Sequence, residues 1–161
     1  MEQQAHTSLA SPCLVKRDVL LIFGLSQRCP CVGNPAIPSQ WNSFLPYLGQ
    51  IEGQIPNVAY GVIYNSDDSG SYDYLCGVGV RAFPAHPHEF TRLRIPPQTY
   101  AVFEHRDHVS AVASTWKAIW EHRLADAGCQ AADGPAFERY DEQFDGRTGL
   151  GGLEIWIPVK A

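Results

Sequence analysis

Residues 151–160 have the sequence Gly-Gly-Leu-Glu-Ile-Trp-Ile-Pro-Val-Lys, a pattern that predicts the closing β-strand of the fold. Because strand side chains alternate between two faces, the aliphatic side chains at positions 153, 155, 157 and 159 share one face. Glu154 and Trp156 share the other. A carboxylate beside an indole in an apolar strand is either solvated or, if it is buried, in need of a partner. The surroundings of Glu154 are therefore the first functional question.

The strand before it, predicted over residues 137–144, carries a second pair of this kind. Glu138 and Tyr140 share one face of that strand, and a Gly-rich turn over 145–152 joins the two strands into a hairpin. Facing side chains of a hairpin are neighbours, so we expect Glu138 and Glu154 to converge on one aromatic patch. Two carboxylates in a dry site repel each other, so one of them would be protonated or would bind a cation.

Outward from this hairpin, one order of elements occurs twice in the chain. An interrupted strand, a helix and a hairpin over residues 14–83 are followed by the same series over 89–160, and the likeness lies in order and spacing. We expect a flexible N-terminus at 1–12 and a single domain of two modules at 13–161. The predicted strands cover 14–25, 58–64 and 72–83, then 90–94, 99–104, 137–144 and 152–159, and the predicted helices cover 38–51 and 109–124.

The fold class that follows is α+β. Two β-α-β-β modules related by a pseudo-twofold would form one curved, mostly antiparallel sheet with two helices on one face. The first helix has apolar residues at three- and four-residue steps, and Pro46 should kink or shorten it. The second helix carries Trp116 and Trp120 on its apolar face. We expect a groove between the two helices, floored by the central strands.

Composition argues against several classes of function. The chain has 161 residues, a net charge of −5 and no basic run, so we expect no direct contact with nucleic acid. No apolar run approaches the roughly 20 residues that span a bilayer, so we expect no membrane partner. The five cysteines are scattered and odd in number, which favours reduced thiols and a cytoplasmic location.

Two groups of residues suggest a metal site, but neither has the spacing that a metal requires. Cys29 and Cys31 form a C-x-C motif without a second pair, and His86 and His88 lie in a Pro-rich connector. Plain thiols and a solvated loop are the simpler interpretations. We therefore expect no metal and no cofactor.

Many aromatic residues fall where they would line the groove. Besides Glu138 and Glu154, the candidates for ligand binding are Trp41, Phe44, Tyr60, Tyr72, Tyr74, Trp116, Trp120, Tyr140 and Trp156. For any one of them the alternative is a place in the core, and for the two tryptophans of the second helix packing on the sheet is the default. An acid among aromatic rings suits a hydrophobic cation, because the rings supply cation–π attraction and the carboxylate compensates the charge.

A series of short motifs spans nearly all of residues 13–160. They are VLLIFGL at 19–25, WNSF at 41–44, YGV at 60–62, DYLCGV at 73–78, IPP at 95–97, YAVF at 100–103, WKAIW at 116–120, FERY at 137–140 and EIWIP at 154–158. In these motifs and their order the chain resembles the GyrI-like family, also called AraC-type effector-binding domains. That family includes multidrug-binding domains of transcription regulators and free-standing integron-cassette proteins that bind cationic drugs.

The resemblance implies two β-α-β-β modules and an aromatic pocket that contains an acid. The closing motif of the family carries over onto Glu154 and Trp156, where tyrosine is more usual at the second position, and the acid of the preceding strand carries over onto Glu138. Family regulators also contain a helix-turn-helix domain, and we expect none within these 161 residues. A protein partner would then be a second copy of the chain or a separate regulator.

The residues and the resemblance together favour a free-standing binding module for hydrophobic, cationic small molecules. Two alternatives stay open. Some family members hydrolyse strained, cyclopropane-type electrophiles, and here Glu138 or Glu154 would serve as general base with Tyr140, Tyr60 or Tyr74 as proton donor. A namesake of the family inhibits gyrase, so the chain could also be a protein-interaction module, although −5 is a modest charge for a DNA mimic.

Overall fold

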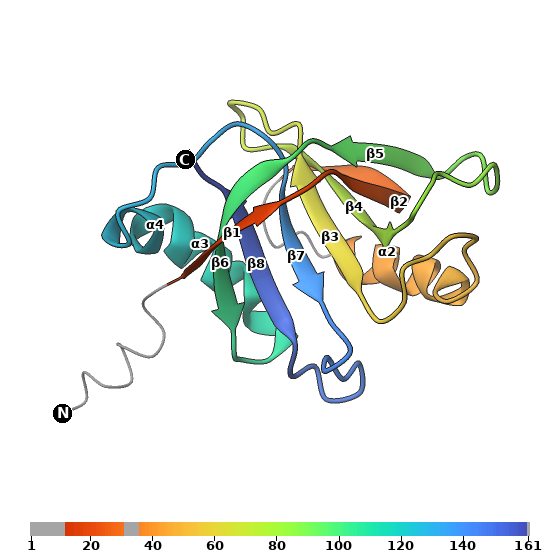
Figure 1. Ribbon diagram of the computed structural model, residues 1–161. Helices are drawn as coiled ribbons and strands as arrows, with labels where there is room; N and C mark the ends of the chain where they lie inside the picture. The colour runs from red at the N-terminus through yellow and green to blue at the C-terminus, as the bar shows by residue number, and fades with distance from the viewer. Residues whose placement is uncertain (1–11, 31–35, 161) are drawn as a thin grey trace.

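The computed structural model describes residues 12–30 and 36–160 (Figure 1), so Cys31 and nearly all of the predicted flexible N-terminus lie outside the described residues. Eight strands form one sheet in the order β1-β6-β8-β7-β3-β4-β2-β5, and neighbouring strands pair antiparallel. The strands are β1 Cys13–Arg17, β2 Leu20–Cys29, β3 Ala59–Tyr64, β4 Tyr72–Gly79, β5 Thr91–Ile95, β6 Gln98–His105, β7 Ala136–Tyr140 and β8 Leu153–Pro158.

The strand order repeats about the centre of the sheet, as expected for two modules related by a pseudo-twofold. β3 of the first module pairs with β7 of the second, and we call this pairing the module seam. Each module begins with an interrupted strand, broken at Asp18-Val19 in the first module and at Pro96-Pro97 in the second. At each break the chain changes partner, because β1 pairs with β6 and β5 pairs with β2. The predicted fold class is confirmed, and the modules exchange their outermost strands.

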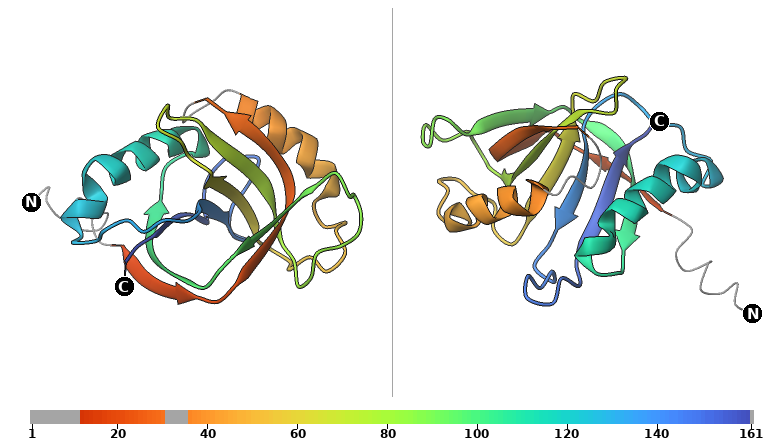
Figure 2. Two further views of the ribbon diagram at one scale, coloured as in Figure 1. Left: turned by 90° about the horizontal axis from the view of Figure 1, so that it is seen from above. Right: turned by 180° about the vertical axis from the view of Figure 1, so that it is seen from behind.

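The two faces of the sheet carry separate cores. On the inner face, Val15 of β1 and Leu93 of β5 come from opposite edges of the sheet but pack against one cluster, so the sheet curls around that cluster. Its largest side chains are Tyr60, Tyr100, Phe137 and Trp156. The outer face carries one apolar cluster under each helix. Figure 2 shows the two helices lying outside the curve of the strands.

The first helix, α2, spans Ala36–Phe44 and continues as a single 3₁₀ turn, Leu45–Tyr47. Pro46 lies in that turn. It lacks a backbone N–H and cannot continue an α-helical hydrogen-bond ladder. The helix therefore ends before residue 51, which agrees with the expected shortening.

The second helix is irregular along its length. It consists of a 3₁₀ turn (Val109–Ala111), α3 (Val112–Ala118), a π-helical turn (Ile119–Arg123) and α4 (Leu124–Asp126). The wider π turn brings Leu124 back to the side of Ile119, and both are buried. Trp120 is 50% exposed, so its expected place on the apolar face is wrong. Within residues 12–30 and 36–160, no helix is long and apolar enough to cross a membrane.

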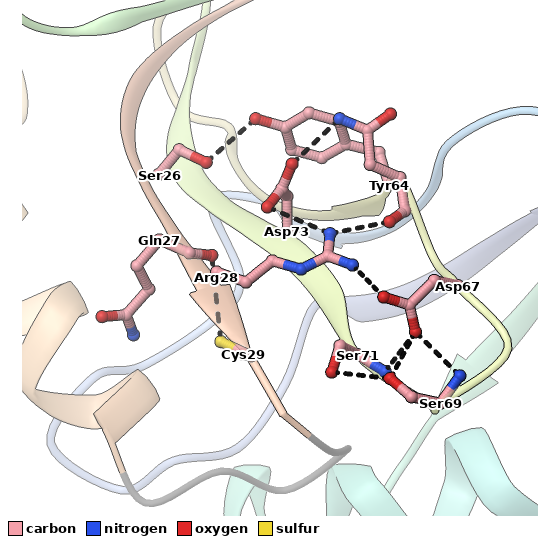
Figure 3. A network of polar contacts seen from close by, with 10 residues as sticks. Ser26, Gln27, Arg28, Cys29, Tyr64, Asp67, Ser69, Ser71 and Asp73 are labelled. Atoms are coloured by element: carbon pink, nitrogen blue, oxygen red, sulfur yellow. Dashed lines mark hydrogen bonds and ion pairs between the residues drawn. The ribbon is translucent and has the colours of Figure 1, made fainter.

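An ion-pair network fixes the loop between β3 and β4 (Figure 3). The hydroxyl of Ser69 donates to Asp67 over 2.6 Å, and Arg28 of β2 contacts the same carboxylate over 2.6 Å. These contacts lower the pKa of Asp67 to about 2. Arg28 also contacts Asp73 of β4 over 3.3 Å. The network ties β2 to the hairpin of β3 and β4 and so helps to hold the first module together.

Candidate functional site

A cavity of about 730 Å³ lies on the outer face of the sheet between the two helices, where the sequence predicts a groove. The first wall, formed by α2 and the residues that follow it, consists of Ile37, Pro38, Trp41, Asn42, Leu45 and Leu48. The second wall, formed by the start of the second helix, consists of Val109, Ser110, Val112, Ala113 and Trp116. The strands form the floor with Ala59, Ile63, Tyr72, Tyr74, Glu138 and Tyr140, and the β7–β8 loop adds Phe144 and Gly146. This lining is mostly apolar and aromatic. Among the described lining residues there is one carboxylate and no Lys or Arg.

Glu138 lies at the floor of the groove and is only 5% exposed. Its Oε1 accepts hydrogen bonds from the hydroxyl of Tyr74 over 2.9 Å and from that of Tyr140 over 2.8 Å. Its Oε2 accepts a hydrogen bond from the indole N–H of Trp116 over 2.9 Å. Three donors therefore hold one buried carboxylate in a fixed orientation.

The donors to Glu138 come from both modules. Tyr74 stands on β4 of the first module, whereas Tyr140 on β7 and Trp116 on α3 belong to the second. Trp41 of α2 donates its indole N–H to the hydroxyl of Tyr74 over 2.9 Å, and its ring packs edge-on against Tyr140 at 5.3 Å between centroids. Both helices and both halves of the sheet thus contribute to one hydrogen-bonded network around the acid.

The environment shifts the pKa of the Glu138 carboxyl and of the two tyrosine hydroxyls in this network. Burial raises the pKa of Glu138 above its usual range, although the hydrogen bonds from Trp116, Tyr140 and Tyr74 and the nearby His105 act in the opposite direction. Burial and the neighbouring carboxylate also raise the pKa of Tyr74 and of Tyr140 well above the usual tyrosine range. Both hydroxyls therefore stay protonated and remain hydrogen-bond donors.

Glu154 does not lie in this groove, so the expected convergence of the two acids is wrong. The register of the last hairpin places Ile155 opposite Glu138 and places Glu154 opposite Arg139. Facing residues share a face and adjacent residues alternate, so Glu138 and Glu154 stand on opposite sides of the sheet. The closing strand sends Ile155 toward the helices and Trp156 into the inner core.

Glu154 has a partner within the protein. Its Oε1 lies 3.5 Å from Nη1 of Arg139 and accepts a hydrogen bond from the indole N–H of Trp156 over 3.1 Å. The side chain is 30% exposed, so its charge is partly solvated as well as paired. Glu154 was expected among the ligand-binding residues, but its carboxylate is paired with a side chain of the protein itself.

Three other candidate residues also lie away from the groove. Tyr60 belongs to the inner core, where its hydroxyl accepts a hydrogen bond from Arg17 over 3.3 Å. Phe44, the last residue of α2, is fully buried in the apolar cluster beneath that helix, and Trp120 projects from the π turn. The candidates that the structure brings together around the cavity are Trp41, Tyr72, Tyr74, Trp116, Glu138 and Tyr140.

Much of the apolar lining was missed by the sequence analysis. Leu45 and Leu48 stay largely exposed at the end of α2, although they belong to its predicted apolar face. Phe144 was expected at the end of the predicted strand 137–144, but β7 ends at Tyr140, and Phe144 lies in the loop that follows, where it packs edge-on against Tyr140 at 5.0 Å between centroids. The helical spacing of Leu45 and Leu48 from Trp41 is the sequence signal that could have identified the two leucines.

The arrangement suits Glu138 for a fixed charge better than for a general base. A base must accept a proton from water, but Oε1 already accepts two hydrogen bonds and Oε2 accepts one. A metal ligand set also has no support in the described residues, which contain no group of three or more His, Cys, Asp or Glu side chains placed to hold an ion. The described lining of the groove therefore offers aromatic rings and one buried carboxylate.

Comparison with known proteins gives one curated relative of high significance. It is the transcriptional regulator BrlR of Pseudomonas aeruginosa, 29% identical over 148 residues, which are 91% of this chain and 54% of the relative. The chain therefore spans about half the length of the curated relative that it matches.

Solved structures with the same fold include two chains that match this one over nearly their whole length. The structure of SAV2435 bound to tetraphenylphosphonium is 19% identical, with 94% of each chain covered and a TM-score of 0.73. The integron cassette protein VCH_CASS2, from the mobile metagenome of Vibrio cholerae, is 17% identical, with 93% of this chain and 96% of that chain covered and a TM-score of 0.66.

A family model described as the GyrI-like small molecule binding domain matches residues 14–160, which include both modules and every described side chain of the groove. The chain belongs to the GyrI-like small-molecule-binding family.

Proposed function

We propose that the groove binds a hydrophobic organic cation and that Glu138 supplies the compensating charge. The observation that carries the proposal is a carboxylate that is 5% exposed, held by three donors, at the floor of an aromatic cavity whose described lining has no Lys or Arg. A charge in such a place is costly unless a cation accompanies it. SAV2435, which has the same fold, is a protein whose structure contains bound tetraphenylphosphonium.

The hydrogen bonds of Glu138 also favour one kind of cation. Because Oε1 already accepts two hydrogen bonds, a ligand that needs to donate several N–H bonds to the carboxylate finds few acceptors. A cation without N–H groups loses nothing in that environment. The rings of Trp41, Trp116 and Tyr140 give it cation–π and apolar contacts instead. Quaternary phosphonium and ammonium ions should therefore bind better than primary amines of similar size.

The test compares two ligands of the same shape and opposite charge. Tetraphenylphosphonium should quench tryptophan fluorescence in a saturable way, because Trp41 and Trp116 line the groove, and should bind about 100-fold more tightly than tetraphenylborate. Calorimetric titration of both ions gives the dissociation constants and the stoichiometry. Equal affinity for the two ions would show that the groove selects for apolar bulk alone and would refute the role of charge.

Cation binding should depend on pH with a defined sign. Because burial raises the pKa of Glu138, the carboxyl becomes neutral at a higher pH than an exposed glutamate does. Affinity should be greatest well above that pKa and should fall as the pH falls through it. The same shift means that the empty folded protein binds the extra proton, so its stability decreases as the pH rises from the unfolded pKa to the folded pKa.

The measurement is the dissociation constant of tetraphenylphosphonium from about pH 4 to about pH 8, a range that includes the usual glutamate pKa. Within the titration window, binding should release a proton, which calorimetry in two buffers of different ionisation enthalpy detects. In Glu138→Gln the affinity should stay constant over the same range. A native protein whose affinity is independent of pH would contradict the charged role of Glu138.

A further inference from the structure

β3 has no side chain at the point where it faces the buried acid. Gly61 lies directly opposite Glu138 across the module seam, and the two positions share the groove face of the sheet. On that face, the neighbouring positions of β3 are Ala59 and Ile63, and both line the cavity. Gly61 is therefore a gap in the floor, next to the carboxylate.

The side chain of Tyr74 passes over this gap. Tyr74 stands on β4 opposite Ile63 of β3, yet its hydroxyl reaches Glu138 on β7, which is the next strand beyond β3. The ring must therefore cross β3 diagonally, from position 63 toward position 61. A Cβ placed on Gly61 would overlap the hydroxyl oxygen of Tyr74 and lie 2.6 Å from Oε1 of Glu138. The hydrogen bond between the two modules exists in the space that this Cβ would occupy.

We propose that Gly61 is a positioning residue of the ligand groove, since its missing side chain admits the Tyr74–Glu138 hydrogen bond by which the first module holds the acid of the second. The proposal rests on the proposed function for its effect on ligands, but not for its effect on Glu138 itself. Steric space explains the glycine without backbone strain, because Gly61 is not among the glycines with a positive φ.

Replacing Gly61 by Ala should change the acid without preventing folding. The atoms that must move are the ends of two side chains, and open groove space lies beside Tyr74. When the Tyr74 hydroxyl leaves Oε1, Glu138 loses a donor that lowers its pKa, so its pKa should rise further. The displaced ring also occupies part of the space that a ligand needs. Gly61→Ala should therefore lower the affinity for tetraphenylphosphonium at least about tenfold at neutral pH.

The experiment uses the full chain with Gly61→Ala, Tyr74→Phe, the double variant, and Gly79→Ala as a matched control. Gly79 lies on β4, and a Cβ there would meet its nearest atom, in Tyr60, at an ordinary 3.5 Å. Two quantities are measured for each variant. One is the midpoint of the titration of Glu138 in the ligand-free protein, from the infrared band of its protonated carboxyl, identified by its loss in Glu138→Gln. The other is the dissociation constant of tetraphenylphosphonium, with near-ultraviolet circular dichroism as the test of folding.

We expect Gly61→Ala and Tyr74→Phe each to raise the titration midpoint of Glu138 by about one pH unit, and the double variant to raise it no further. Gly79→Ala should match the native protein in both measurements. If Gly61→Ala leaves the midpoint and the affinity as in Gly79→Ala, or if its shift adds to that of Tyr74→Phe, the proposal is wrong. If the native protein binds no cation but the midpoints move as expected, the positioning role stands and the proposed function fails.

Discussion

Replacing Glu138 by Gln should weaken the binding of tetraphenylphosphonium about 100-fold at neutral pH. The substitution keeps the size of the side chain and removes its charge, so the groove keeps its apolar contacts and loses the compensation of the cation. It also leaves the three donors from Tyr74, Tyr140 and Trp116 with one amide oxygen in place of two carboxylate oxygens. Fluorescence or calorimetric titration measures the change, and the thermal unfolding midpoint shows whether the variant is folded.

The chain supplies a matched control for this substitution. Glu154→Gln removes the same charge from the next strand, but Glu154 stands on the other face of the sheet and is paired with Arg139. Its effect on the dissociation constant should stay within about twofold. A folded Glu138→Gln protein that binds the cation as tightly as the native protein would overturn the proposed function. A large loss in Glu154→Gln alone would restore Glu154 as the ligand-binding acid.

The largest effect on stability should come from Trp156, which lies on the side of the sheet away from the groove. Its ring is stacked on Phe137 at 5.4 Å between centroids with an interplanar angle of 18°, and it meets Tyr100 edge-on. Trp156→Ala removes a buried indole from the middle of the inner core and leaves a cavity there. We expect a loss of about 3–5 kcal/mol in the free energy of unfolding, measured with chemical denaturant.

Two substitutions, Trp120→Ala and Trp156→Phe, provide the controls for this prediction. Trp120→Ala removes the same side chain from a site that is 50% exposed and should cost less than about 1 kcal/mol. Trp156→Phe keeps a ring in the stack and should cost less than Trp156→Ala. Where Trp156→Ala is still folded, its affinity for tetraphenylphosphonium should stay within about threefold of the native value. Loss of binding in the folded variant would mean that Trp156 belongs to the site after all.

The fold could be predicted because its signals are local. The spacing of Trp41, Leu45 and Leu48 predicts the first helix, and alternation of side chains predicts each strand. The repeated order of elements then requires two equivalent modules, and pairing them gives the observed sheet. The exchange of β1 and β5 between modules was not predicted, because the sequence of neither module indicates which edge of the sheet the first part of its interrupted strand joins.

The position of the acid could not be settled in the same way, because it depends on register. Glu138 and Glu154 differ in face only because Glu138 lies opposite Ile155 and not opposite Glu154. A shift of one residue in the pairing of β7 with β8 would have put the two acids on the same face. The sequence of the glycine-rich loop between the strands does not show how many residues form the turn, so it does not determine the register. Both faces of β8 are buried, so hydrophobicity does not distinguish them either. Composition identified the right kinds of residue, and only the pairing identified which acid they surround.

The exchange of the outermost strands has a consequence for folding. β1 completes the sheet beside β6, so that Cys13 faces Val102, and β5 does the same beside β2. The chain therefore has a high contact order. One module alone would leave an edge strand unpaired, because β2 needs β5 and β6 needs β1 from the other module. Since Glu138 also takes donors from both halves, a partly folded chain has no complete site. Ligand binding at the proposed site should thus be linked to the cooperative folding of the whole domain, and a ligand in the groove should protect even the distant edge strands from local opening.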